Sequence, residues 1–193
     1  MAKTPKRHSE RSPDPVAEAS AYQRMLLGLV GDDDPAEVQA ATPALVKSLL
    51  EQAGSDISTR PAEGEWSVLE LLGHLADAEL VVSGRYRWAL CEDEPPLLPY
   101  DQDRWVGGLR HNEDDPSELL AGFAALRTAN LALWSRLSQA QRRRLGMHAE
   151  RGPESVDMMF RMLAGHDRFH MNQIRKTLEV VRKAGTERTA GRT

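Results

Sequence analysis

Apolar residues recur at steps of three and four along almost every periodic stretch of this 193-residue chain, and strict alternation is nearly absent. A step of three or four returns a side chain to the same face of an α-helix, whereas alternation is typical of a strand. The pattern therefore predicts an all-α fold. The longest such row consists of Met159, Leu163, His166, His170, Ile174, Leu178 and Val181.

The segment EWSVLELL carries the clearest helix start signal. Ser67 is suited to cap a helix, and Glu70 stands three residues later, where it completes a capping box. Trp66 and Leu71 occupy the two ends of a hydrophobic staple. These signals predict a helix over 68–91.

Start and stop residues place the remaining helices. Thr42 as N-cap, Pro43 at the first helical position and Gly54 just past the end predict a helix over about 42–53. Asp115 as cap, followed by Pro116, predicts the start of another. With weaker signals included, the helices expected beside 68–91 are 16–30, 42–53, 116–137 and 154–183.

Long helices joined by loops of moderate length are the pattern of a four-helix up-and-down bundle, here with short extra helices in the loops. We expect this domain to span residues 15–183. The polar segments 1–14 and 184–193 are expected to be disordered tails. The loop 92–108 is too rich in proline and glycine for one continuous element.

Composition excludes several classes of partner. The formal net charge is −4 and the isoelectric point is near 5.9, so the chain lacks the basic excess of a nucleic-acid-binding protein. No apolar run approaches a membrane span, and no apolar segment follows the basic N-terminus as in a secretory signal. We expect a cytoplasmic protein, and the single cysteine, Cys91, fits a reducing compartment.

Three histidines fall on inward helix faces. His166 and His170 lie one turn apart in the long apolar row, so their imidazoles can converge on one point. His74 belongs to a second row with Leu71, Ala78 and Val82 on the helix 68–91. The helical pattern thus directs three imidazoles toward the core from two helices.

Such histidines have two interpretations. A single inward histidine is more often a core residue bonded to a backbone carbonyl, and His74 alone would be read in that way. Three neutral imidazoles leave three donors and three acceptors to satisfy in a dry interior, and one metal ion would use a lone pair of each. We therefore predict a metal site at His74, His166 and His170. The other histidines are expected in a tail (His8), a polar loop (His111) and an exposed position (His148).

The segments EWSVLELLGHLADAE and GHDRFHMNQI resemble the paired motifs of the DinB/YfiT-like superfamily of metalloenzymes, and the resemblance covers about residues 40–180. It implies a four-helix bundle with metal ligands at His74, His166 and His170. It also implies frequent homodimers. The resemblance further implies an activity found in some members of the superfamily, the transfer of low-molecular-weight thiols such as mycothiol or bacillithiol.

Three neutral imidazoles leave an open coordination position, which is typical of a catalytic metal site. Bound water there has its pKa lowered to roughly 7, and a bound thiol is deprotonated. We expect a divalent ion, zinc or nickel, in a metal-dependent thiol transferase or hydrolase acting on a small molecule. Two alternatives stay open: a non-catalytic metal- or ligand-binding stress protein, and a protein-interaction bundle without a metal.

Several polar residues lie near the inward rows. Asp167 in HDRFH is placed like the glutamate of an HExxH motif, but an ion pair or an outer position at the metal site is favoured. Arg127 and Asn130 are expected to line the substrate pocket, unless Arg127 extends past the core to water. Glu70 is assigned to its capping box, and Gln173 is placed where it can orient a ligand.

Overall fold

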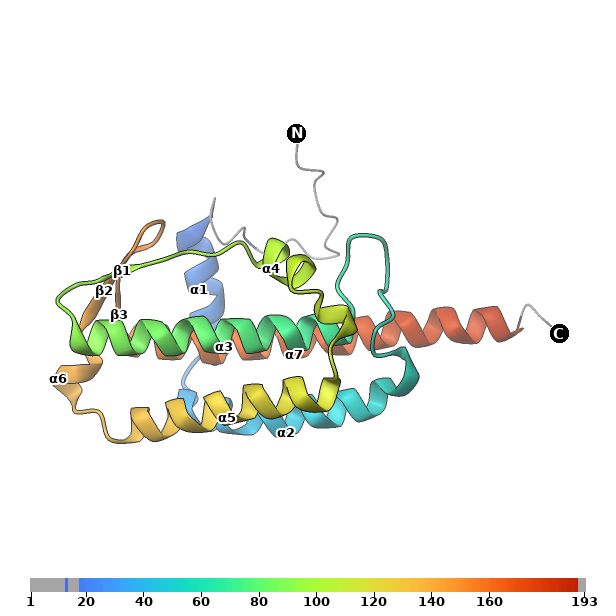
Figure 1. Cartoon of the computed structure of the whole chain (residues 1–193), viewed down its shortest axis with the longest axis horizontal. Coiled ribbons are helices and arrows are strands. Elements are labelled where there is room, and N and C mark those ends of the chain that lie inside the picture. The colour runs from blue at the N-terminus through green and yellow to red at the C-terminus, as the bar shows by residue number, and fades with distance from the viewer. Residues whose placement is uncertain (1–12, 14–17, 191–193) are drawn as a thin grey trace.

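The computed structural model describes residue 13 and residues 18–190. Four long helices form a bundle in this part of the chain, as Figure 1 shows: α2 (Pro35–Ala53), α3 (Val68–Cys91), α5 (Pro116–Ser135) and α7 (Val156–Ala190). The predicted helical bundle is confirmed. None of the described helices has the length and apolar character needed to cross a membrane.

The four long helices do not simply alternate in direction along the chain. In Figure 1, α3 and α5 run in the same direction, and α2 and α7 both run in the opposite one. The direction repeats because segment 92–115 returns along the outside of the bundle before α5 begins. Each of α3 and α2 packs closely on both α5 and α7, which places α2 and α3 on one diagonal.

Shorter elements fill the connections. They are α1 (Ala19–Val30), the 3-10 turn η1 (Gly54–Asp56), β1 (Pro96–Leu97), α4 (Gln102–Gly108), the 3-10 turn η2 (His111–Glu113), α6 (Gln139–Arg142), β2 (Leu145–His148) and β3 (Gly152–Ser155). The strands form a small sheet in which β2 pairs parallel with β1 and antiparallel with β3. The sequence predicted no strand, since two to four residues are too few to display alternation.

The predicted helix 68–91 matches α3 at both ends. The Ser67 hydroxyl accepts from the Glu70 amide at 3.1 Å, and the Ser67 amide donates to the Glu70 carboxylate at 2.9 Å, which completes the capping box. Arg60 forms an ion pair with the same carboxylate. Two partners therefore fix the first turn of the helix that carries His74. The start of α5 at Pro116, capped by Asp115, also matches.

The predicted start of the second helix is wrong. Helix α2 begins at Pro35 with Asp34 as its cap, so Pro43 lies inside the helix and Thr42 does not cap it. Proline has no amide hydrogen, and Pro43 therefore leaves the carbonyl of Gln39, four residues earlier, without its helical donor. Arg127 supplies the replacement: its Nη1 donates to the Gln39 carbonyl at 3.0 Å. A partner from α5 makes the internal proline tolerable.

The last helix is longer than predicted, since α7 begins at Val156 and continues to Ala190. Residues 184–190, expected in a tail, continue the helix. The other tail, 1–14, lies outside the described residues apart from residue 13, as do Val16 and residues 191–193.

Buried side chains form two apolar clusters with a polar layer between them. One cluster gathers around Leu72, Phe123 and Ile174, and the other around Tyr86 and Phe160. Each of the four bundle helices contributes buried polar residues to this layer. They include Gln39, Thr42, His74, Glu79, Arg127, Asn130, His166, Asp167 and His170.

Helix α1 rests directly on α7 at a glycine. A Cβ atom on Gly165 would lie 2.0 Å from the carbonyl oxygen of Leu26, which is closer than any real contact. Only glycine allows the two backbones to approach in this way. The contact positions α1 beside His166, where Tyr22 and Leu26 form part of a cavity wall.

Candidate metal centre

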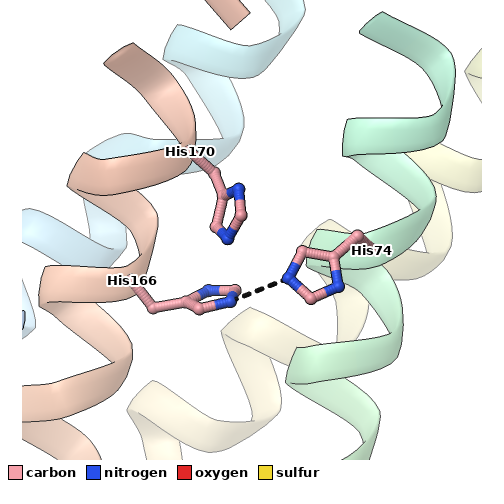
Figure 2. Close-up of side chains that lie close together, drawn as sticks. All are labelled: His74, His166 and His170. Carbon is pink, nitrogen blue, oxygen red and sulfur yellow. Dashed lines mark hydrogen bonds between the residues drawn. The ribbon is translucent and has the colours of Figure 1, made fainter. Parts of the chain in front are cut away.

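The three inward histidines meet between α3 and α7. Figure 2 shows His74 extending from α3 toward His166 and His170, which lie one turn apart on α7. The Nε2 atoms of His74 and His166 are 3.0 Å apart. One nitrogen of each ring lies within 4.8 Å of the others. The structure thus brings the three predicted residues together.

All three rings are buried, with 1%, 8% and 4% of His74, His166 and His170 exposed. Burial, together with the neighbouring rings of His170 and His74, lowers the pKa of His166 well below its usual value. Burial also lowers the pKa of His170 to about 4. Both imidazoles are therefore neutral near pH 7, which is the form that offers a lone pair to a metal.

The nitrogen cluster fits one metal ion. Two nitrogen ligands of a tetrahedral zinc ion lie ~3.3 Å apart, since each Zn–N bond is about 2.0–2.1 Å long. The distance of 3.0 Å between Nε2 of His74 and of His166 is close to this value. The His170 Nδ1 is 2.9 Å from Oε1 of Gln173, so it donates there and its Nε2 keeps a lone pair. Gln173 thus orients His170, as expected.

His111 helps to define the position of His74. It was expected in a polar loop, but it is only 6% exposed and its ring packs where a Cβ on Gly73 would lie. Its ring nitrogens lie 2.9 Å from Asp77 and 2.7 Å from Asp114. Burial alone would lower the pKa of His111, but these two carboxylates outweigh it and raise the pKa.

A cavity of about 620 Å³ extends from the histidine cluster along the bundle. His74 and His166 contribute to its wall, so a molecule inside it can reach their ring nitrogens. The rest of the wall includes Tyr22, Leu26, Ala78, Val82, Arg85, Tyr100, His148, Arg151, Glu154, Met159, Met162 and Leu163, with segment 99–103 and Glu150. Neither the size nor the shape of the cavity could be predicted from the helical pattern.

Arg127 and Asn130, expected to line the pocket, are not among the residues of this wall. Both are 1% exposed, so Arg127 does not extend to water either. Arg127 Nε donates to Glu79 at 2.8 Å, and Nη2 donates to Asp167 at 3.0 Å. Asn130 donates to the other oxygen of Glu79 at 2.7 Å. These residues form a buried ionic network that joins α3, α5 and α7.

Asp167 belongs to the same network. Both of its oxygens accept from Arg127, and one also accepts from the Thr42 hydroxyl at 2.8 Å. The ion pair is fully buried rather than at the surface. With its oxygens occupied in this way, Asp167 is not placed to act as the general base of an HExxH motif.

Two residues of the cavity wall were not predicted there from the sequence. His148, expected to be exposed, is 3% exposed at the end of β2. No local signal marks it, because its burial depends on the pairing of three short strands. Arg85 had a signal: the row Leu71, His74, Ala78 and Val82 continues at a step of three to Arg85.

A solved structure shares this architecture. The solved structure of YfiT from Bacillus subtilis superposes with a TM-score of 0.70 at 23% identity, covering 91% of this chain and 94% of that one. It is described as having an unusual four-helix bundle topology, so the fold is shared.

Two proteins with similar sequences share the same description. A protein of Oceanobacillus iheyensis is 26% identical over 139 residues, which are 72% of this chain and 80% of the relative. YfiT of Bacillus subtilis is 30% identical over 115 residues, which are 59% and 65%. Both are provisionally named metal-dependent hydrolases. The family model described as the DinB superfamily matches residues 35–174, and the chain belongs to this superfamily.

Proposed function

We propose that His74, His166 and His170 bind one divalent metal ion, zinc or nickel, and that the protein is a metal-dependent hydrolase acting on a small molecule. The observation that carries the proposal is the convergence of three buried imidazoles, two of which line a cavity. The provisional names of the relatives support the same reaction class.

His74, His166 and His170 would hold the ion, which would supply a Lewis acid able to lower the pKa of bound water toward neutrality. The chain supplies the rest. Gln173 holds the His170 ring in one orientation, and the buried rings stay unprotonated near neutral pH. Apolar side chains such as Val82 and Leu163 form part of the cavity wall and would lower the local polarity around a bound molecule.

Metal content tests the site. The protein would be purified without a metal-affinity tag, and its metal measured by elemental analysis for wild type, His166→Ala, His170→Ala and His148→Gln. We expect near-stoichiometric metal in wild type and in His148→Gln, whose ring lines the cavity but lies outside the cluster. We expect its loss in the other two variants. Metal-free wild type that takes up neither zinc nor nickel would overturn the proposal and favour a bundle without a metal.

Turnover distinguishes hydrolysis from the other reactions open to the site. The metal-loaded protein would be assayed with 4-nitrophenyl esters, with and without an added low-molecular-weight thiol. Release of 4-nitrophenol without thiol, abolished in His166→Ala, supports hydrolysis. Release only with thiol, accompanied by a thioester product, would replace hydrolysis by thiol transfer. Stoichiometric metal without turnover of any substrate class would favour the non-catalytic alternative.

A further inference from the structure

The cavity follows one face of α3 from His74 to Arg85. Ala78 and Val82 lie between them on that face, and all four residues line the cavity. Eleven residues of helix place the two Cα atoms about 16 Å apart along the axis. The Arg85 side chain leans back toward the helix N-terminus and therefore toward His74. The two ends of the cavity thus carry different chemistry.

Arg85 is a buried cation without a carboxylate partner. Only 6% of the residue is exposed. Its Nη2 donates to the carbonyl of Leu98 at 2.5 Å, and its Nε has no hydrogen-bond partner among the described residues. None of the ion pairs found in that part of the chain includes Arg85. An uncompensated buried charge is costly, which indicates that a ligand supplies the missing anion.

Arg151, the other arginine of the cavity wall, does have a carboxylate partner. Glu154 accepts from its Nε at 2.5 Å and from its Nη2 at 3.1 Å. The remaining acidic residues of the wall, Asp101, Asp103 and Glu150, are exposed and screened by water. Glu154 and Glu150 act on Arg85 only at longer range, so none of the described carboxylates forms an ion pair with it.

His148 provides a second unused donor in the same cavity. Its Nδ1 accepts from the backbone amide of Glu150 at 3.3 Å, so the neutral ring carries its proton on Nε2. This Nε2 is buried and has no partner among the described residues. Burial, with the positive charges of Arg151 and Arg85, lowers the pKa of His148 to about 4. Near pH 7 the ring is therefore a neutral donor close to the arginines.

We propose that Arg85 and His148 form a subsite for the carboxylate of the substrate. The proposal rests on the proposed function, because the reacting group of the same molecule would lie at the three histidines. A single unmatched positive charge fits a monoanion such as a carboxylate better than a phosphate dianion. Between the two ends the wall is apolar, with Ala78, Val82, Met159 and Leu163. The substrate class is thus an elongated carboxylate with an apolar middle.

Calorimetric titration of the full-length protein as purified tests the subsite. The probes are octanoate, octyl phosphate and 1-octanol, which share one apolar chain and differ in charge. We expect octanoate to bind wild type more tightly than octyl phosphate. In Arg85→Met we expect octanoate to bind about tenfold more weakly or worse, with 1-octanol unchanged. His148→Phe, which lacks the donor, is expected to weaken octanoate binding in the same direction.

Arg104→Met is the matched control, since Arg104 is an exposed cation one residue beyond the cavity wall. Octanoate binding is expected to stay within about twofold of wild type in this variant. Thermal unfolding gives a second readout: the melting temperature of Arg85→Met should equal or exceed that of wild type, because an unpaired buried charge is removed. An arginine with a purely structural role would show the opposite change.

Three results would overturn the subsite: no octanoate binding by wild type, equal octanoate binding by wild type and Arg85→Met, or tighter binding of octyl phosphate. The metal proposal fails on a different measurement, the metal content of the histidine variants. Metal present without Arg85-dependent octanoate binding would remove the subsite and leave the metal site. Arg85-dependent binding without any metal would leave an anion subsite and overturn its link to a reacting group at the histidines.

Discussion

His166 and Asp167 are consecutive residues of α7, yet their side chains belong to different clusters. His166 meets His74 of α3, with 3.0 Å between the two Nε2 atoms. Asp167 is paired with Arg127 of α5. Successive residues of a helix point about 100° apart, so one turn can serve two neighbours. The position of the candidate metal ligand is thereby tied to the buried ionic network.

Arg127→Met should destabilise the protein strongly. The variant leaves Glu79 and Asp167 as buried carboxylates without their cation, and breaking such a pair costs about 3–5 kcal/mol. The measurement is the free energy of unfolding from urea denaturation. Arg136→Met, which removes an exposed cation next to the same helix, should change it by less than about 0.5 kcal/mol. Equal losses in both variants would contradict a central role for the network.

Gln173→Ala should weaken metal binding without removing the site. Gln173 accepts the hydrogen bond that orients His170, and loss of such a partner lowers metal affinity by about 10–100-fold. Competition with a chromophoric chelator measures the affinity. Asn172→Ala, at the neighbouring exposed position, should bind metal like wild type. If both variants bind equally well, Gln173 does not position the ring.

Gly165→Ala should destabilise the packing of α1 on α7. The new Cβ would lie 2.0 Å from the Leu26 carbonyl oxygen, and such overpacking costs about 1–3 kcal/mol. Gly122→Ala in α5 is the control, since a Cβ there meets nothing within 4 Å. That change should stabilise the helix by about 0.5–1 kcal/mol. Thermal unfolding that shows the same sign of change for both variants would argue against the close contact.

His111 should make the stability of the protein depend on pH. Because the folded state raises its pKa above the ordinary 6.5, the protonated ring contributes stability that is complete below that value. The contribution is lost as the pH rises through the folded pKa. The difference in unfolding free energy between wild type and His111→Asn should therefore be larger at about pH 6 than at about pH 9. A difference that grows with pH would contradict this assignment.

The features that depend only on neighbouring residues could be predicted from the sequence. Ser67 and Glu70 fix the start of α3 whatever surrounds it, so its position could be predicted from eight residues. The row through His166 and His170 was likewise predictable, because helical spacing alone decides which side chains face inward. Because the inward faces of α3 and α7 point into the same bundle core, the contact of these residues with His74 could also be predicted.

The features that could not be predicted from the sequence depend on contacts between distant residues. Thr42 and Pro43 have the form of a helix start, and only Arg127, 84 positions beyond Pro43, makes the internal proline acceptable. The inward row of its helix predicts the same arginine at the pocket, because its two carboxylate partners, Glu79 and Asp167, lie on other helices and leave no local signal. His148 becomes buried only when its strand pairs with two others. None of these partners is near in the sequence.

The parallel course of α3 and α5 requires a segment that returns the chain along the bundle, and residues 92–115 do this. The same segment supplies residues 99–103 of the cavity wall and the ring of His111 against Gly73. A connection that the topology requires therefore also shapes the cavity. Through His111 it also contacts the face of α3 next to His74. A change in this one connection would therefore alter both the wall of the cavity and the packing beside His74.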